Sequence, residues 1–418
     1  MGEDIIPFFG EVKDQMKNII KVVGVGGGGC NAVANMYKER VEGVTYAVCN
    51  TDSQSLSRSP VPVKIQLGEG LGAGGNPEQG RCEAETNIND FVKLLSDGTK
   101  MVFVTAGMGG GTGTGAAPVV AGVAKDMGIL TVGVVTLPFK MEMRKRMDKA
   151  LLGMEALKKC VDSLIVINNQ RLLENERYNK LTLEEGLKKA DEVLTIATKT
   201  IAEIITVKGS INRDYNDVRT VMKDGGAALV SVAKASGEKR IFKALSEAIS
   251  SPLVANVEKQ KVRRLLYIVY SGNQNPARMD ELEEISEFME NFDENLDVLW
   301  GHYPDETLGD EIKVAVVATG FDQNDGEEGT DVNHAKQDEM KRLKDLREKF
   351  YTHAHAASKE DEMPEETCVP IVEQPPVIEH DDDEPEEEDT EEREDAAPKT
   401  PTFVEILFGK MKKLMEEE

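Results

Sequence analysis

The sequence predicts an α/β protein in which a parallel sheet, covered by helices on both faces, is followed by a long helix and a second, smaller α/β domain. Two observations support this fold class. Strand-like runs alternate with helix-like stretches in the first part of the chain, and each run is continuously apolar, as is typical of strands buried on both faces. A single long helical pattern then separates this part from a second set of strand candidates.

The expected elements follow in chain order. Five strand candidates lie at 19–25, 44–49, 101–105, 129–137 and 163–167. Apolar residues then recur at helical spacing between Leu183 and Val207, which predicts one amphipathic helix. Four more strand candidates lie at 226–232, 263–270, 296–300 and 312–318, with an amphipathic helix near 279–292.

These patterns divide the chain into consecutive segments. In order they are a flexible arm (1–17), a first domain (18–182), a central helix (183–208), a connecting loop (209–217), a second α/β domain (218–320), an acidic linker (321–400) and a tail peptide (401–418). The linker is too poor in apolar residues to offset the entropy of ordering it, so we expect disorder there. Its charged stretch 339–351 has the composition of a transient helix.

Composition rules out several classes of protein. The net charge of −26 argues against a broad nucleic-acid surface, and most of that charge lies in the linker. The chain has no apolar run long enough to span a membrane and does not begin like a signal peptide. The five cysteines are widely spaced without a CxxC pair, so we expect reduced thiols and a cytoplasmic protein. All five histidines lie beyond residue 300, which leaves the first domain without a histidine catalyst.

The first glycine-rich motif is GVGGGGCN, residues 24–31, directly after a strand candidate and at the start of a helix. Backbone N–H groups and the helix dipole at such a turn can hold a phosphate. With Asp52 at the end of the next strand, the motif also fits the dinucleotide fingerprint of an NAD-dependent oxidoreductase. This motif alone therefore leaves a tight turn, a dinucleotide site and a nucleoside triphosphate site open.

Two further glycine-rich stretches favour the triphosphate. Residues 107–115 read GMGGGTGTG, again between a strand and a helix, and residues 68–75 read GEGLGAGG. So many glycines are entropically costly, which makes a purely structural turn a poor explanation. Several cradles can surround a triphosphate, whereas a dehydrogenase needs one. No GxxxxGK[ST] is present, so the chain is not a P-loop enzyme.

These motifs resemble the FtsZ family, the tubulin-like GTPases of bacterial cell division. The signature GGGTGTG stands at 109–115, the first glycine loop at 26–31, the NTD motif at 50–52 and GLGAGGNP at 70–77. The similarity extends from about residue 19 to 320. It implies a tubulin/FtsZ-like fold with a parallel-sheet GTPase domain, a long central helix and a smaller C-terminal α/β domain.

The resemblance also implies which residues bind GTP or GDP. They are Gly26, Gly27, Gly28, Gly29, Cys30, Asn31, Asn50, Asp52, Ala73, Gly74, Gly109, Gly110, Gly111, Thr112, Gly113, Thr114, Glu142, Arg146, Asn169, Leu187 and Asp191. Glu142 and Arg146 would contact the ribose, and Asn169 and Asp191 the base. A carboxylate suits guanine because it accepts hydrogen bonds from N1–H and N2–H. No protein metal site is implied, and Mg²⁺ would accompany the nucleotide.

A third motif, NRDYND, lies at 212–217. By itself it is a turn that caps the next helix. In the family this position is the catalytic loop, so the resemblance implies that Asn212, Asp214 and Asp217 act on nucleotide held by the adjacent subunit. Arg213 and Asn216 replace the usual apolar and small residues, just as Met143 stands at a usual glycine.

The implied function is a cytoplasmic GTPase that polymerises head to tail and assembles into the division ring at the inner face of the membrane at mid-cell. The tail peptide, 401–418, can form a short amphipathic helix and is expected to bind a membrane adaptor and other division proteins. A plasmid-partition filament is the alternative within the superfamily, but a basic tail is expected there. An NAD-dependent oxidoreductase would leave the second glycine loop unexplained.

Overall fold

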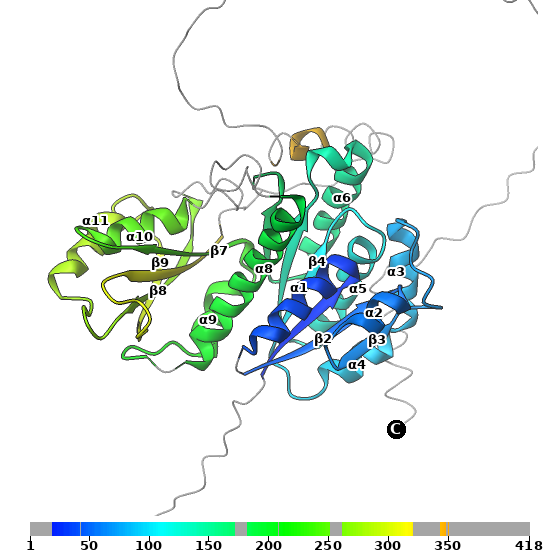
Figure 1. Cartoon of the computed structure of the whole chain (residues 1–418), viewed down its shortest axis with the longest axis horizontal. Coiled ribbons are helices and arrows are strands. Elements are labelled where there is room, and N and C mark those ends of the chain that lie inside the picture. The colour runs from blue at the N-terminus through cyan, green and yellow to red at the C-terminus, as the bar shows by residue number, and fades with distance from the viewer. Residues whose placement is uncertain are drawn as a thin grey trace, which may run out of the picture. The chain divides into compact units, whose positions relative to one another are not determined.

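The computed structural model describes residues 19–41, 43–171, 182–207, 209–250, 261–320, 343–347 and 350, and its architecture is shown in Figure 1. Ten strands form one hydrogen-bonded sheet in the order β3-β2-β1-β4-β5-β6-β7-β10-β8-β9. The strands are β1 (Ile20–Val25), β2 (Val44–Asn50), β3 (Val63–Gln66), β4 (Met101–Gly107), β5 (Leu130–Leu137), β6 (Ser163–Asn168), β7 (Gly226–Ala235), β8 (Arg264–Ser271), β9 (Asp297–Pro304) and β10 (Ile312–Thr319). Nine of them match the strand candidates of the sequence, and β3 was missed.

The direction of pairing changes where the first domain gives way to the second. Strands β3 to β7 pair in parallel throughout, whereas β10 runs antiparallel to both β7 and β8. The joint between the two parts is short, because β6 and β7 pair only from Ser163↔Gly226 to Ile165↔Ala228. The strand order reverses next to β1, and in such sheets ligands bind at the carboxyl ends of the strands near that point.

The helices connect successive strands. They are α1 (Gly26–Glu39), α2 (Ser53–Arg58), α3 (Pro77–Thr86), α4 (Ile88–Leu95), α5 (Thr112–Asp126), α6 (Arg144–Cys160), α8 (Leu183–Thr206), α9 (Tyr215–Met222), α10 (Arg240–Ile249) and α11 (Glu283–Met289), with short 3₁₀ turns η1 (Lys140–Glu142) and η3 (Asp280–Leu282). In the described residues, no helix is long and apolar enough to cross a membrane.

The parallel part of the sheet is buried on both faces, as its continuous apolar runs predicted. Val22 and Val23 are neighbours in β1, yet they belong to two different hydrophobic clusters. One cluster includes residues of α1 and α8, and the other includes residues of α3 to α6. A third cluster lies between α10, α11 and the antiparallel strands of the second domain.

The long helix α8 has the apolar face that its sequence predicted and, in addition, a capped start that was not predicted. Thr182 caps it, because its hydroxyl accepts a hydrogen bond from the Glu185 N–H while the Glu185 carboxylate accepts one from the Thr182 N–H. Along one face, Ala190, Leu194 and Ile201 are buried, and the last two belong to the sheet's hydrophobic cluster. The helix contacts α1 of the first domain and β7 of the second, so it lies between the two parts of the molecule (Figure 1).

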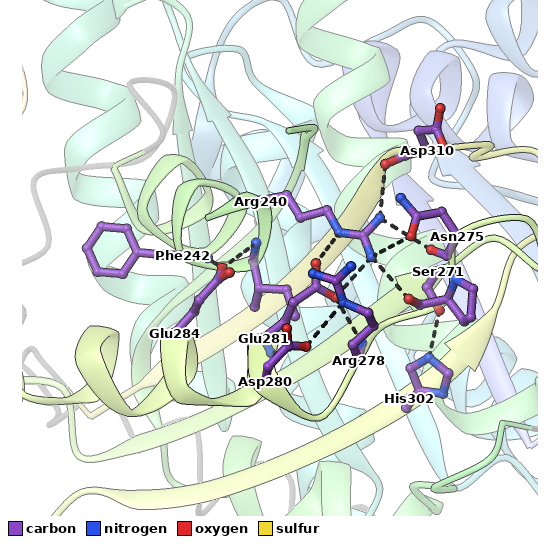
Figure 2. A network of polar contacts seen from close by, with 12 residues as sticks. Arg240, Phe242, Ser271, Asn275, Arg278, Asp280, Glu281, Glu284, His302 and Asp310 are labelled. Carbon is purple, nitrogen blue, oxygen red and sulfur yellow. Dashed lines mark hydrogen bonds and ion pairs between the residues drawn. The ribbon is translucent and has the colours of Figure 1, made fainter. Parts of the chain in front are cut away.

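A buried ion pair organises the second domain (Figure 2). Arg240, the first residue of α10, is 2% exposed, and its Nε and Nη2 donate to the two carboxylate oxygens of Glu281 at 2.7 and 3.0 Å. The same guanidinium donates to the backbone carbonyls of Asn275, Pro276 and Asp310. Its charge and its donors are thus satisfied inside the protein, as burial of an arginine requires.

One segment of the predicted linker has a defined place. Residues 343–347 are helical, and Leu343 and Phe350 are buried in the same hydrophobic cluster as α3 to α6. This helix is orange in Figure 1. A transient helix was expected at 339–351, but its packing was not, because a partner surface far away in sequence supplies the burial. The arm 1–17, the tail 401–418 and the rest of the linker lie outside the described residues.

Candidate nucleotide site and catalytic loop

The glycine-rich loops meet at one edge of the parallel sheet. β1 ends at Val25 and β4 at Gly107, and these neighbouring parallel strands pair up to Val25↔Ala106. Because carboxyl ends of parallel strands share an edge, the loops at 26–31 and 107–115 emerge side by side. The sheet thus brings together two loops that are far apart in the sequence.

In the first loop, glycine is required by close backbone contacts. Gly26 has φ +70°, and a Cβ added there would lie 2.7 Å from the backbone N of Gly113 in the second loop. A Cβ at Gly29 would lie 2.1 Å from the carbonyl oxygen of Thr105. Gly27 differs, since a Cβ there would meet no atom within 4 Å, so this residue faces open space. No side chain caps the start of α1, which leaves its first N–H groups available to an anion.

The second loop has the same character. Gly109 has φ +98°, and its N–H donates to the Thr114 hydroxyl at 2.9 Å. Gly110 faces open space, because a Cβ there would also meet nothing within 4 Å. The hydroxyls of Thr112 and Thr51 lie 2.6 Å apart, which ties this loop to the end of β2. Like α1, α5 starts without a side-chain cap.

The third loop closes against the second. A Cβ on Gly111 would lie 2.8 Å from the Cβ of Ala73, and Ala73 is buried. Gly74 has φ +55° and faces open space. Asn76 caps α3 by accepting a hydrogen bond from the Glu78 N–H. The three loops therefore form one cluster with the open glycines Gly27, Gly74 and Gly110.

Two of the expected residues have side chains that serve the fold itself. The Cys30 thiol donates to the carbonyls of Gly24 and Cys49, and burial raises the pKa of this thiol to about 12. Asp52 caps α2 by accepting hydrogen bonds from the N–H groups of Gln54 and Ser55 at 2.9 and 3.3 Å. The Cys30 side chain is thus committed to the core and the Asp52 carboxylate to a helix start.

Three other expected positions differ in exposure. Gly28, in the first turn of α1, is exposed, and a Cβ there would lie 3.3 Å from the Cα of Gly107. Asn50 is buried at the end of β2, while Asn31 is exposed on α1. Asn31 is therefore the one of these whose side chain is accessible from solvent.

The pair expected at the ribose lies beside the second loop. Arg146 Nε is 2.9 Å from Glu142 Oε2, and Glu142 Oε1 accepts a hydrogen bond from the Phe139 N–H at 2.8 Å. The Arg146 Cγ packs over Gly109, where a Cβ would come within 2.8 Å of it. Between the pair, Met143 has φ +71° and ψ 159°, a conformation that favours glycine. This explains physically why glycine suits that position.

The two residues expected at the base have unusual environments. Asn169 follows β6 and is 8% exposed, and its Oδ1 is buried without a hydrogen-bond partner among the described protein atoms. Such an orphaned polar atom is costly unless something else pairs with it. Burial raises the pKa of Asp191, on α8, to about 6. Leu187 lies one turn earlier on the same helix, and its side chain is outside the described set.

The predicted catalytic residues lie at the other end of the parallel strands from the glycine loops. Asp214 and Asp217 form a capping box at the start of α9, with reciprocal N–H to carboxylate distances of 3.0 and 3.1 Å. The side chain of Asn212 accepts a hydrogen bond from the Gly209 N–H at 2.6 Å. The capping role expected from the bare motif is therefore present, and it holds both carboxylates in fixed positions.

Tyr215 locates this loop relative to the glycine cluster. Its hydroxyl donates to the carbonyl of Lys100 at 2.9 Å, directly before β4 begins, whereas the second glycine loop follows the other end of the same strand. At about 3.3 Å per residue, the length of β4 puts about 20 Å between the two ends. Within one chain, the structure does not bring Asp214 and Asp217 to the glycine loops.

Comparison with known proteins places the chain in a family. Residues 19–177 match the Tubulin/FtsZ family, GTPase domain, and residues 226–322 match the FtsZ family, C-terminal domain. "Cell division protein FtsZ" of Porphyromonas gingivalis is 46% identical over 325 residues, covering 77% of this chain and 71% of that protein. The protein of the same name from Coxiella burnetii is 46% identical over 312 residues, covering 73% and 80%.

Solved structures agree. The "FtsZ dimer, empty" of M. jannaschii superposes with a TM-score of 0.67 at 38% identity, covering 76% of this chain and 96% of that one. The glycine-loop cluster lies in the matched GTPase domain, and the antiparallel strands lie in the matched C-terminal domain. The chain is thus a GTPase that belongs to the FtsZ family.

Proposed function

We propose that this GTPase acts in cell division as a head-to-tail polymer, in which one subunit holds GTP on its glycine loops and the next subunit supplies the catalytic loop. The main support for this proposal is the distance, along β4, between the glycine loops and the predicted catalytic loop. Because about 20 Å of strand lies between the glycine loops and Asp214, the two halves of the site need a second chain to meet. If subunits stack in the same direction, the end of β4 that carries the glycine loops in one subunit faces the end near Asp214 in the next subunit.

Exposed apolar side chains at the two ends support this stacking. Near the glycine loops, Leu71 is 87%, Met143 72% and Met141 60% exposed. Near the catalytic loop, Val207 and Ile211 are also exposed. Large apolar side chains held in water at opposite ends of one molecule favour a repeating contact between different surfaces, which generates filaments.

The residues of the cluster suit a guanine nucleotide. The N–H groups at the starts of α1 and α5 would hold the phosphates, and the open faces of Gly27 and Gly110 let a phosphate approach the backbone. The unpaired Asn169 Oδ1 would accept a donor of the base. Asp191, when ionised, would accept hydrogen bonds from guanine N1–H and N2–H, which adenine lacks.

For hydrolysis, the Asp214 and Asp217 carboxylates of the neighbouring subunit would accept hydrogen bonds from the attacking water, and Asn212 would help to position it. Among the described residues, no cluster of three His, Cys, Asp or Glu side chains could hold a metal ion. We therefore expect Mg²⁺ to depend on the oxygens of the nucleotide phosphates, whose charge it offsets.

Assembly and hydrolysis can be tested together. GTP turnover per subunit should rise sharply above a threshold protein concentration. Asp214→Ala should abolish turnover and leave GTP affinity nearly unchanged, and mixed into wild-type protein it should inhibit beyond simple dilution. A turnover rate that is constant per subunit at all concentrations, with additive rates in mixtures, would contradict a site shared between subunits.

The tail, 401–418, lies outside the described residues, and we propose from its sequence that it binds a membrane adaptor and so places the filaments in a ring at mid-cell. Deleting it should leave GTPase activity in solution unchanged and remove filaments from the membrane in cells. Loss of polymerisation in solution would show instead that the tail belongs to the filament. The acidic linker and apolar tail disfavour a plasmid-partition filament, for which a basic tail is expected.

A further inference from the structure

Residues 343–347 and 350, here called the docked segment, pack on the GTPase domain. Leu343 and Phe350 are each 8% exposed, and Leu346 packs against the same hydrophobic cluster. Their spacing of three and four residues puts them on one face of a helix. Asp345, on another face, is exposed. An amphipathic segment therefore covers an apolar surface of the domain.

Two polar contacts fix the segment where it lies. Arg347 donates from Nε and Nη2 to Oδ1 of Asp148, at 2.7 and 2.6 Å, and both side chains are partly buried. At the end of the segment, the Phe350 carbonyl accepts a hydrogen bond from Nδ2 of Asn168, which is 1% exposed. Hydrophobic packing alone would not require these directional contacts.

Both contacts are made with elements of the nucleotide site. Asp148 lies on α6, close after Arg146 of the ribose pair. Asn168 is the last residue of β6 and directly precedes Asn169, whose Oδ1 has no partner among the described residues. The segment therefore touches the helix that carries one proposed nucleotide contact and the strand end that carries another.

Two further hydrogen bonds connect Asn168, at the end of β6, to the turn η1 that carries Glu142. The Asn168 Oδ1 accepts from the Gln170 N–H at 3.0 Å, and Oε1 of Gln170 accepts from the Lys140 N–H at 3.0 Å. Lys140 begins the turn that ends at Glu142. One chain of contacts thus connects the Phe350 carbonyl, the base-reading loop and the ribose pair.

We propose that the docked segment is a positioning element of the guanosine site. Docked, it holds the Asn168 amide and α6 in place, so that Asn169 and the Glu142–Arg146 pair are arranged before nucleotide arrives. Preorganisation of this kind raises affinity by lowering the ordering cost of binding. Because linkage is reciprocal, bound GDP or GTP must in turn favour docking of the segment. The inference rests on the proposed assignment of these residues to the nucleotide.

The test is equilibrium binding of a fluorescent GDP to full-length protein below the polymerisation threshold. Arg347→Ala and Phe350→Ala should each raise the dissociation constant of GDP about fivefold or more. About fivefold is the lower end of the range typical of coupling between two linked sites. Arg347→Lys, which keeps the charge beside Asp148, should recover most of the affinity. Asp345→Ala, an exposed change on the same helix, is the matched control and should bind GDP like wild type.

Hydrogen exchange on wild-type protein supplies a readout that does not depend on variants folding. Amides of 343–347 should exchange more slowly when GDP is bound. Unchanged exchange, or wild-type affinity in both Arg347→Ala and Phe350→Ala, would overturn the proposal. Asn169→Ala distinguishes failure of the positioning role from failure of the base assignment. If Asn169→Ala weakens GDP binding while Arg347→Ala and Phe350→Ala do not, only the positioning role is refuted. Wild-type affinity in Asn169→Ala would refute the base assignment itself.

Discussion

The carboxylate of Asp191 should make nucleotide affinity depend on pH. Burial raises its pKa to about 6 in the free protein. Only the ionised form can accept both guanine donors, so bound nucleotide must lower this pKa. Protons are therefore released on binding whenever the free protein has Asp191 protonated, and affinity must fall as the pH drops through about 6.

The size of the effect follows from the position of the pKa. With a pKa of about 6, roughly nine-tenths of Asp191 carboxyls are ionised at pH 7 and roughly one-tenth at pH 5. If the bound form stays ionised over this range, the dissociation constant of GDP should rise about tenfold between these pH values, or about 1.4 kcal/mol.

The assay is a series of GDP titrations from pH 7.5 to 5, about the range over which Asp191 gains its proton. Nucleotide phosphates also gain protons near pH 6, so wild type alone would not isolate the carboxyl. Asp191→Asn provides the control, because it keeps the phosphate contribution and lacks the carboxyl. The ratio of the two dissociation constants should change about tenfold. A ratio that is constant with pH would refute the role of Asp191 in reading the base.

Two further predictions concern stability. Arg240→Met should lower the free energy of unfolding by about 3–5 kcal/mol in urea denaturation, because it leaves the buried Glu281 carboxylate without its cationic partner. Arg278→Met, which removes an exposed ion pair with Asp280, should change the free energy of unfolding little, and equal effects of the two substitutions would contradict the burial argument. Met143→Gly should stabilise the protein by about 1 kcal/mol, because it relieves a backbone conformation that only glycine adopts easily; a lower unfolding midpoint would show that the Met143 side chain contributes more than the strain costs.

Much of the fold could be predicted because its signals are local. Continuous apolar runs indicated nine strands, and helical spacing indicated α8 close to its observed bounds. The short strand β3 was missed, since it has only four residues, three of them exposed, and so lacks the continuous apolar run that marks the buried strands. Glycine spacing likewise revealed all three loops, because close backbone approach leaves no other residue type possible at positions such as Gly26 and Gly29.

What the sequence by itself determined, then, is the set of parts: the strands, the central helix, the glycine loops and the acidic motif at 212–217. Their spatial relations depend on contacts between residues far apart in the chain, which no local pattern encodes. Only the tertiary structure put Asp214 at the end of β4 away from the glycine loops, through the hydrogen bond from Tyr215 to Lys100. Only the structure turned the Cys30 thiol into the core.

The docked segment shows the same division most clearly. The charges of 339–351 suggest at most a transient helix, because a short isolated helix in water is marginal. Its stability comes from burying Leu343 and Phe350 on a surface built by other elements, and from pairing Arg347 with Asp148 at a separation of 199 residues. Propensity was present in the sequence, but the partner surface that decides whether the helix persists exists only after the sheet and α6 have assembled.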